Sequence, residues 1–138
     1  MNITAIVLTH NEENHIARCL QSLHGVTDNI FVVDSYSTDE TVHIAKSLHA
    51  SVASHAFTNH AAQFNWALQH LPWEADWILR VDTDEVITPE LAHEIRERLQ
   101  HLPMDVAGVE LPRRMAFLGR PIRWGGVFPT HVTRLFRA

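Results

Sequence analysis

Residues 77–91 read WILRVDTDEVITPEL, and this stretch indicates how the chain folds. It begins with a mostly apolar run at 77–81, typical of a strand buried on both faces. Three carboxylates follow where this strand should end: Asp82, Asp84 and Glu85. Thr88 then offers a capping hydroxyl and Pro89 suits the first helical position, which predicts a helix to about His101. The negative charge therefore marks either a solvated turn or a place where something positive is held.

The same order of strand, polar residues and helix occurs earlier in the chain. Three more strands are predicted from apolar, β-rich runs: 3–8, 30–33 and 51–54. We expect Asn11 to cap the first helix, residues 37–40 (STDE) to form a capping box for the second, and 61–71 to be the third. This alternation predicts an α/β fold with a mostly parallel sheet and helices on both faces.

The last third of the chain has a different pattern. Residues 106–111 and 131–136 read as strands, and we expect an antiparallel strand near the C-terminus. The loop between them, 112–129, is long for a compact domain and is a candidate functional segment. Its cationic side chains suit a diphosphate, an anionic acceptor or a membrane surface, with a solvated loop as the alternative: Arg113, Arg114, Arg120 and Arg123. Trp124 is either a platform for a sugar or an anchor of the loop.

Composition restricts the class of protein. The chain has 138 residues, 46% hydrophobic and 20% charged, which fits one globular domain. Its formal charge of −5 argues against a general nucleic-acid binder. Cys19 is the single cysteine, so the chain forms no internal disulfide and we expect a reducing compartment. Cys19 lies in a helical apolar pattern, so we expect its side chain to be buried. Because neither a signal peptide nor a membrane span is recognised, we expect a cytoplasmic protein, with association at the inner face of the membrane left open.

The polar residues that follow the strands are candidates for one site. Ligands of open parallel sheets bind beyond the carboxyl ends of the strands. If strand 3–8 lies between strands 30–33 and 77–81, the residues after all three share one crevice. Carboxylates gathered there repel one another unless they are protonated, solvated or bound to a cation. Mg²⁺ or Mn²⁺ prefers oxygen ligands and would link this acidic site to an anionic diphosphate.

Other chemistries fit the sequence less well. The chain has 11 histidines but no HxH spacing, and HEIRE at 93–97 lacks the second histidine of a zinc-protease helix. Gly125 and Gly126 do not have the spacing of a Rossmann or Walker phosphate loop. Ser35 and Ser37 have no matching base arrangement, which argues against a serine hydrolase.

Five segments, distributed along nearly the whole chain, resemble the family 2 glycosyltransferases, inverting enzymes with the GT-A fold. The similarity is closest to the bacterial branch that builds lipopolysaccharide core and related surface glycans. The matching segments, in chain order, are AIVLTHNEENHIARCLQSL, NIFVVDSYSTDET, AAQFNWAL, DWILRVDTDEVITPEL and THVTRLFR. The second and fourth are specific when they occur together and in this order.

The resemblance implies a role for each matching polar residue. The residues implied to bind the nucleotide are Thr9, Asn11, Glu12, Asp34, Ser35 and Asp82. Among them, Glu12 would be near the ribose or base, and Asp34 would accept a hydrogen bond from the base, typically uracil N3–H. Asp82 would lie near ribose and metal, and Asp84 would be the direct ligand of Mg²⁺ or Mn²⁺ on the diphosphate.

The implied reaction is transfer of a sugar, with inversion, from a nucleotide-diphosphate sugar to a saccharide or lipid-linked acceptor. The UDP-sugars are the expected donors. One domain, 1–138, would comprise a nucleotide-binding part at 1–101 and the start of an acceptor-side part at 102–138. Relatives continue for about another hundred residues, which usually carry the catalytic base. The base is therefore unassigned, with Glu110 and His131 as weak candidates.

The sequence also departs from the family pattern. Tyr36 and Glu40 stand where relatives often have glycine, and Phe64 stands where they often have lysine or arginine. Two alternatives follow: a nucleotide-sugar-binding module without a base, or a nucleotidyltransferase. The latter would normally have a glycine-rich, basic loop after the first strand, and THNEEN is neither. Homodimerisation is left open.

Overall fold

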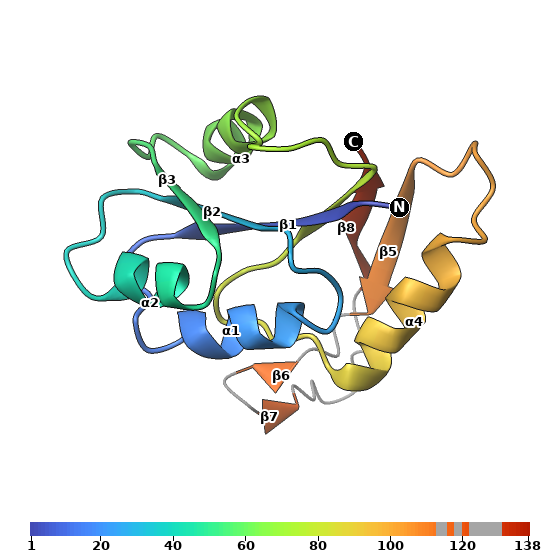
Figure 1. Ribbon diagram of the computed structural model, residues 1–138, viewed down its shortest axis with the longest axis horizontal. Helices are drawn as coiled ribbons and strands as arrows, with labels where there is room; N and C mark the ends of the chain where they lie inside the picture. The colour runs from blue at the N-terminus through green and yellow to red at the C-terminus, as the bar shows by residue number, and fades with distance from the viewer. Residues whose placement is uncertain (113–115, 118–119, 122–130) are drawn as a thin grey trace.

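The computed structural model describes residues 1–112, 116–117, 120–121 and 131–138, and it has the expected α/β architecture (Figure 1). The elements in chain order are β1 (Ile3–Thr9), α1 (Ile16–Leu23), β2 (Ile30–Asp34), α2 (Thr41–Ser47), β3 (Ser51–Ser54), α3 (His60–Gln69), β4 (Trp77–Arg80), α4 (Pro89–Leu99), β5 (Gly108–Pro112), β6 (Ala116–Phe117), β7 (Arg120–Pro121) and β8 (His131–Arg137). Within this part of the chain, no helix is both long and apolar enough to cross a membrane.

The strand order of the main sheet is β3-β2-β1-β4-β8-β5. The first four of these strands are parallel, and β8 runs antiparallel to both β4 and β5. Strand β1 thus lies between β2 and β4, which is the condition set for their polar ends to meet. An antiparallel strand lies near the C-terminus, as predicted. The carboxyl ends of β1, β2 and β4 consequently meet at one edge of the sheet. Both termini lie at the opposite edge, where Asn2 and Ala138 hydrogen-bond to the backbone of Asp76.

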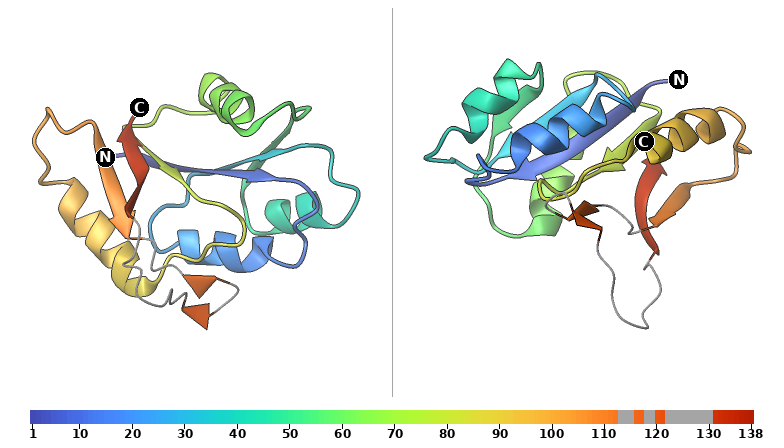
Figure 2. Two further views of the ribbon diagram at one scale, coloured as in Figure 1. Left: turned by 180° about the vertical axis from the view of Figure 1, so that it is seen from behind. Right: turned by 90° about the horizontal axis from the view of Figure 1, so that it is seen from below.

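Two apolar layers cover the sheet, one on each face. Because side chains alternate along a strand, Ala5 and Val7 face one layer and Ile6 faces the other. The first layer packs against α1, α2 and α4, and the second packs against α3. Figures 1 and 2 show α3 alone on one side of the sheet and the other three helices on the opposite side. Burial on both faces explains why the strands read as continuous apolar runs.

The helix beginnings separate correct predictions from wrong ones. Helix α4 begins as predicted: Pro89 is the first helical residue, and the Thr88 hydroxyl accepts a hydrogen bond from the Leu91 amide. The expected cap of the first helix by Asn11 is wrong, because α1 starts only at Ile16, after a turn.

The capping box expected at residues 37–40 is also wrong. Helix α2 begins at Thr41, and Glu40 at its N-cap makes no side-chain capping bond. Asp39 instead accepts a hydrogen bond from the Thr41 amide.

Candidate functional site

The site begins with hydrogen bonds that tie the ends of β1 and β2 together. Thr9 Oγ1 donates to Asp34 Oδ1 at 2.8 Å, and the register pairs these two residues. The Ser37 amide donates to Asp34 Oδ2 at 2.8 Å, and the Ser37 hydroxyl donates to Oδ1 at 2.6 Å. Asp34 is 1% exposed, so its carboxylate organises the loop after β2 from inside.

The loop after β1 is attached to the same scaffold. The Asn11 amide donates to Ser37 Oγ at 2.7 Å, and Asn11 Oδ1 accepts from the Thr38 amide at 2.8 Å. The Glu12 amide donates to Thr41 Oγ1 at 2.8 Å. Asn11 has a φ of 50°, in the left-handed region that asparagine tolerates better than most residues. These bonds fix where the Glu12 side chain begins.

A cavity of about 480 Å³ opens beside these loops. Its lining comes from the ends of β1 and β2 and from the segment leading into α3: Leu8, Thr9, His10, Glu12, Ser35, Tyr36, Ala56, Phe57, His60 and Gln63. Three of the predicted nucleotide-binding residues, Thr9, Glu12 and Ser35, therefore share one cavity. The volume and the mixture of aromatic and polar walls suit a small molecule with a planar ring and polar groups. Asn11 and Asp34 are not in the lining and instead hold the loops that form it.

Sequence reasoning did not identify the part of the wall that comes from Ala56 to Gln63. Gln63 is buried and holds His55 on two sides: its Oε1 lies 2.7 Å from His55 Nδ1, and its Nε2 donates to the His55 carbonyl at 3.0 Å. The segment AAQFNWAL contains Gln63, but no local signal places that side chain beside β1.

Tyr36, one departure from the family pattern, has a left-handed backbone conformation. Its φ is 53°, a left-handed conformation that glycine adopts without strain. The backbone therefore has the shape that suits glycine, although the residue is tyrosine. Tyr36 is 63% exposed and lines the cavity, so the substitution adds an aromatic ring at its mouth.

Phe64, a second departure, is packed rather than free. Its ring meets Phe136 edge-on at 5.8 Å, and the Arg80 guanidinium lies 5.2 Å from its centroid. A cation thus lies over the ring at this position, although it belongs to β4.

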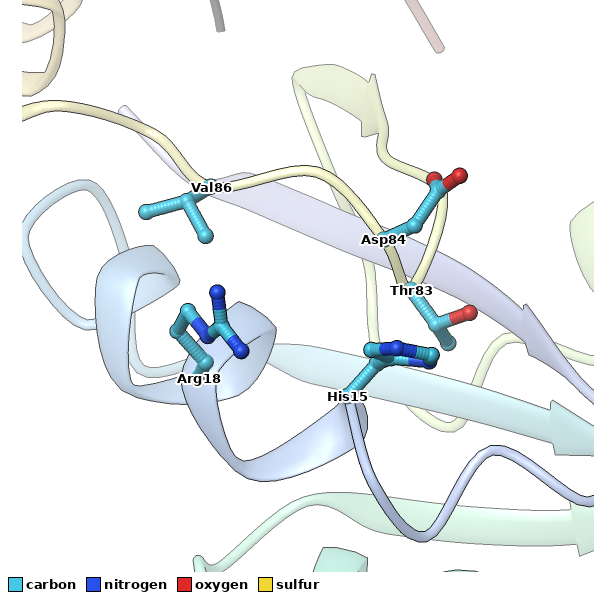
Figure 3. Close-up of a pocket in the computed structure, with 5 residues that line it drawn as sticks. All are labelled: His15, Arg18, Thr83, Asp84 and Val86. Carbon is cyan, nitrogen blue, oxygen red and sulfur yellow. The ribbon is translucent and has the colours of Figure 1, made fainter. Parts of the chain in front are cut away.

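The acidic turn after β4 lies at the same edge of the sheet. Five residues surround a small hollow there: His15, Arg18, Thr83, Asp84 and Val86 (Figure 3). Asp84 is half-buried, and its carboxylate points away from His15 and Arg18. His15 Nδ1 lies 3.1 Å from Glu12 Oε2. Glu12 lines the large cavity and His15 lines the hollow beside Asp84, so this contact lies between the two.

The three acids of the turn have different environments. Glu85 is 7% exposed; its Oε1 accepts from the Asp82 amide at 2.8 Å, and both its oxygens lie 3.0 Å from the Arg134 guanidinium. Asp82 is 55% exposed at its side chain, with Oδ2 3.7 Å from Arg134 Nη2. Burial raises the pKa of Glu85, whereas the Asp82 amide and Arg134 favour its charged form. Cys19, predicted to be buried, is buried beneath this turn, with Sγ 3.5 Å from the Asp82 carbonyl.

The acids available to a metal are Asp82 and Asp84. Among the described residues, no group of three or more His, Cys, Asp or Glu side chains is arranged to hold an ion. A closed protein cage is thus not formed by these residues. Mg²⁺ typically takes one or two protein carboxylates and completes its shell with water and substrate phosphate. Two carboxylates at the edge of the sheet fit that mode of binding.

Neither candidate for the catalytic base can be tied to the acidic turn. Glu110 is an exposed residue of β5, paired in register with Thr133. His131 begins β8, but its side chain lies outside the described residues, as do Arg113, Arg114, Arg123, Trp124 and the Arg120 side chain.

Comparison with known proteins gives a consistent family. Residues 4–123 match the model of Glycosyl transferase family 2. An uncharacterized glycosyltransferase of Rickettsia typhi is 41% identical over 93 residues, which cover 67% of this chain and 31% of the relative. The chain therefore spans about a third of the length of the curated relatives it matches.

Solved structures agree on the fold. A mannosyltransferase from Pyrobaculum calidifontis, in complex with GDP-Man and Mn²⁺, has a TM-score of 0.67 and 23% identity, covering 82% of this chain and 36% of the other. S. aureus TarS has a TM-score of 0.64 and 23% identity, covering 83% and 40%. A second TarS structure contains UDP-GlcNAc. The architecture is thus the GT-A fold of these glycosyltransferases, as predicted.

Proposed function

Because the chain belongs to glycosyl transferase family 2, we propose that it binds a nucleotide-diphosphate sugar, with UDP-sugars the expected donors, at the carboxyl edge of β1, β2 and β4. The observation that carries this proposal is the Glu12–His15 contact. Glu12 lines a cavity of about 480 Å³, large enough for a base and ribose, and its partner His15 lies beside the acidic turn that carries Asp84. A donor that extends across these two residues would have its base in the cavity and its diphosphate at the acidic turn.

Each predicted residue has a proposed task in this arrangement. Thr9, Glu12 and Ser35 would contact the nucleoside, since they line the cavity. Asn11 and Asp34 would act by holding the loops. A direct bond from Asp34 to a base would use Oδ2, which accepts one hydrogen bond, from the Ser37 amide.

Asp84 and Asp82 would hold a divalent ion, Mg²⁺ or Mn²⁺. The support is their position after β4, together with the Mn²⁺ present in the structure of the similar mannosyltransferase. When bound, such an ion supplies positive charge that stabilises the departing diphosphate. Asp84 would contribute the carboxylate that is free to turn toward it, since Asp82 is drawn toward Arg134.

For the reaction, we propose inverting transfer to a saccharide or lipid-linked acceptor of a bacterial surface glycan, at the inner face of the membrane. A carboxylate or imidazole base would take the proton of the acceptor hydroxyl as its oxygen attacks the anomeric carbon. Residues 1–101 would bind the donor and 102–138 would begin the acceptor side. This part of the proposal rests on the resemblance of the five sequence segments, and Glu110 and His131 are the candidates for the base.

Isothermal titration tests the donor site. UDP should bind in the presence of Mn²⁺, more tightly than GDP, and Asp84→Asn should weaken that binding at least tenfold. Asp105→Asn is the matched control, because Asp105 is an exposed acid on the loop between α4 and β5. Equal binding by Asp84→Asn and the unsubstituted chain would refute the metal role.

Turnover distinguishes an enzyme from a binding module. Incubation with UDP-sugars and Mn²⁺ should release UDP by slow hydrolysis or by transfer to an added saccharide. Tight donor binding with no UDP release from any donor and acceptor would support a module without a base.

A further inference from the structure

A buried ion pair lies directly behind the acidic turn. Glu85 and Arg134 are each 7% exposed, and the two guanidinium Nη atoms each lie 3.0 Å from a different Glu85 oxygen. Arg134 belongs to β8, so the pair joins the strand nearest the C-terminus to the loop after β4. Paired oxygens and paired nitrogens fix the orientation of both side chains, which a single contact would not do.

Glu85 also closes the turn by hydrogen bonds to Asp82. Glu85 Oε1 accepts a hydrogen bond of 2.8 Å from the Asp82 amide, and the Glu85 amide donates to the Asp82 carbonyl at 2.9 Å. Residues 82–85 are thereby closed into a tight turn with Thr83 and Asp84 at its tip. Thr83 is 7% exposed and Asp84 is half-buried, so the tip of the turn packs against the rest of the protein.

Arg134 also offsets the negative charge of some carboxylates of the turn and not of others. Its guanidinium is shared between Glu85 and, at 3.7 Å, Asp82. Asp84 has no ion pair within the described part of the chain. One cation therefore offsets much of the charge of two acids and leaves the third available.

We propose that Glu85 and Arg134 are positioning residues for the metal-diphosphate end of the donor site, which orient the turn so that Asp84 meets the cation. This inference rests on the proposed function. Glu85 itself is not a metal ligand, because both its oxygens are occupied by Arg134 and the Asp82 amide. Arg134 makes the site depend on β8, and thus on residues 102–138, although the acids themselves lie in residues 1–101.

Stability alone does not explain a buried ion pair well. The two charges lose hydration that their attraction often fails to offset, and apolar residues of similar size are frequently as stable. A stabilising role can therefore be distinguished from a positioning role, because the double variant Glu85→Leu/Arg134→Met removes the pair without leaving a lone buried charge. A purely structural pair could be replaced in this way at no cost to ligand binding.

The experiment measures the UDP affinity of the chain by titration, once with Mn²⁺ and once with EDTA. The ratio of the two affinities is the metal-dependent part of binding. We expect the double variant to melt near the temperature of the unsubstituted chain, to retain its metal-free UDP affinity, and to lose roughly 10- to 100-fold of the metal-dependent part, as is typical for residues that orient metal ligands. Arg98→Met is the matched control, since Arg98 pairs with Glu94 on the exposed face of α4.

Arg134→Lys is a second variant that tests the proposal if the double variant fails to fold. Lysine keeps the charge but cannot bind both oxygens of Glu85 in parallel, so an intermediate loss of the metal-dependent part is expected. If every folded variant of Glu85 and Arg134 keeps that part within twofold, while Asp84→Asn loses it, the positioning role is wrong and the donor site stands. If the unsubstituted chain binds no UDP with or without Mn²⁺, the proposed function itself is wrong.

Discussion

Thr9 Oγ1 donates a hydrogen bond of 2.8 Å to Oδ1 of Asp34 across the ends of two neighbouring parallel strands. Thr9 is 4% exposed and Asp34 is 1% exposed, so water cannot replace the lost partner if either side chain is changed. This bond is the innermost of those that hold the wall of the cavity.

Thr9→Val tests that bond, because valine has nearly the same shape and no donor. The variant leaves the Asp34 carboxylate with one hydrogen bond fewer in a buried place, which should lower the free energy of unfolding by about 1–3 kcal/mol. Urea denaturation measures the loss. Thr9→Ser keeps the donor and should lose clearly less; equal losses in the two variants would assign the effect to packing.

A second prediction concerns the left-handed backbone at Tyr36, where φ is 53°. A non-glycine residue in this region carries about 1–2 kcal/mol of strain. Tyr36→Gly should therefore be about 1 kcal/mol more stable than Tyr36→Ala, which removes the same ring but keeps the strain. If the ring contacts the base, both variants should bind UDP several-fold more weakly and to the same extent.

The order of the elements followed from local sequence, and the details of the site did not. The apolar runs of β1, β2 and β4 are buried on both faces, and the start of α4 at Thr88-Pro89 depends only on neighbouring residues. The strands and this helix start could therefore be predicted from the sequence. Ser37 has the right position for a capping box, but its hydroxyl binds the Asp34 carboxylate and accepts from the Asn11 amide. Tertiary partners on another loop outcompeted the local cap.

The Glu85–Arg134 pair shows the same limit over a longer range. Two residues separated by 49 positions meet because β8 lies antiparallel to β4, and nothing near either residue signals the contact. The sequence marked Glu85 as one of three acids in a turn. Only the packing of β8 distinguishes Glu85, which is buried against Arg134, from the more exposed acids Asp82 and Asp84.

A third prediction concerns the thiol of Cys19. Burial raises its pKa, and the carboxylates of Glu85, Asp82 and Asp84 raise it further, because a thiolate there would lie in a dry and negative environment. Since the thiolate is the reactive form, Ellman's reagent at pH 8 should react with the folded chain far more slowly than with the chain in guanidinium. Fast reaction of the folded chain would show that α1 separates readily from the acidic turn.

A fourth prediction treats the Glu85–Arg134 pair as a double-mutant cycle in stability. Arg134→Met alone leaves Glu85 buried without its cation and should lower the free energy of unfolding by about 3–5 kcal/mol. Adding Glu85→Leu removes the unpaired charge and should restore most of that loss. Denaturation of the two single variants and the double variant measures the coupling; additive losses would mean that water already screens the pair.

The fifth prediction is that ligand binding raises the melting temperature only when the acidic turn is intact. A ligand at one hundred times its dissociation constant stabilises the folded chain by about 2.7 kcal/mol. For a domain of this size, that corresponds to an increase in Tm of roughly 6–10 °C.

UDP with Mn²⁺ should produce such a shift in the unsubstituted chain and in Asp105→Asn. EDTA or Asp84→Asn should remove most of it, since the diphosphate would then face the carboxylates without a cation between them. An equal shift in Asp84→Asn would place the nucleotide away from this turn, because the neighbouring cavity alone would then account for the binding.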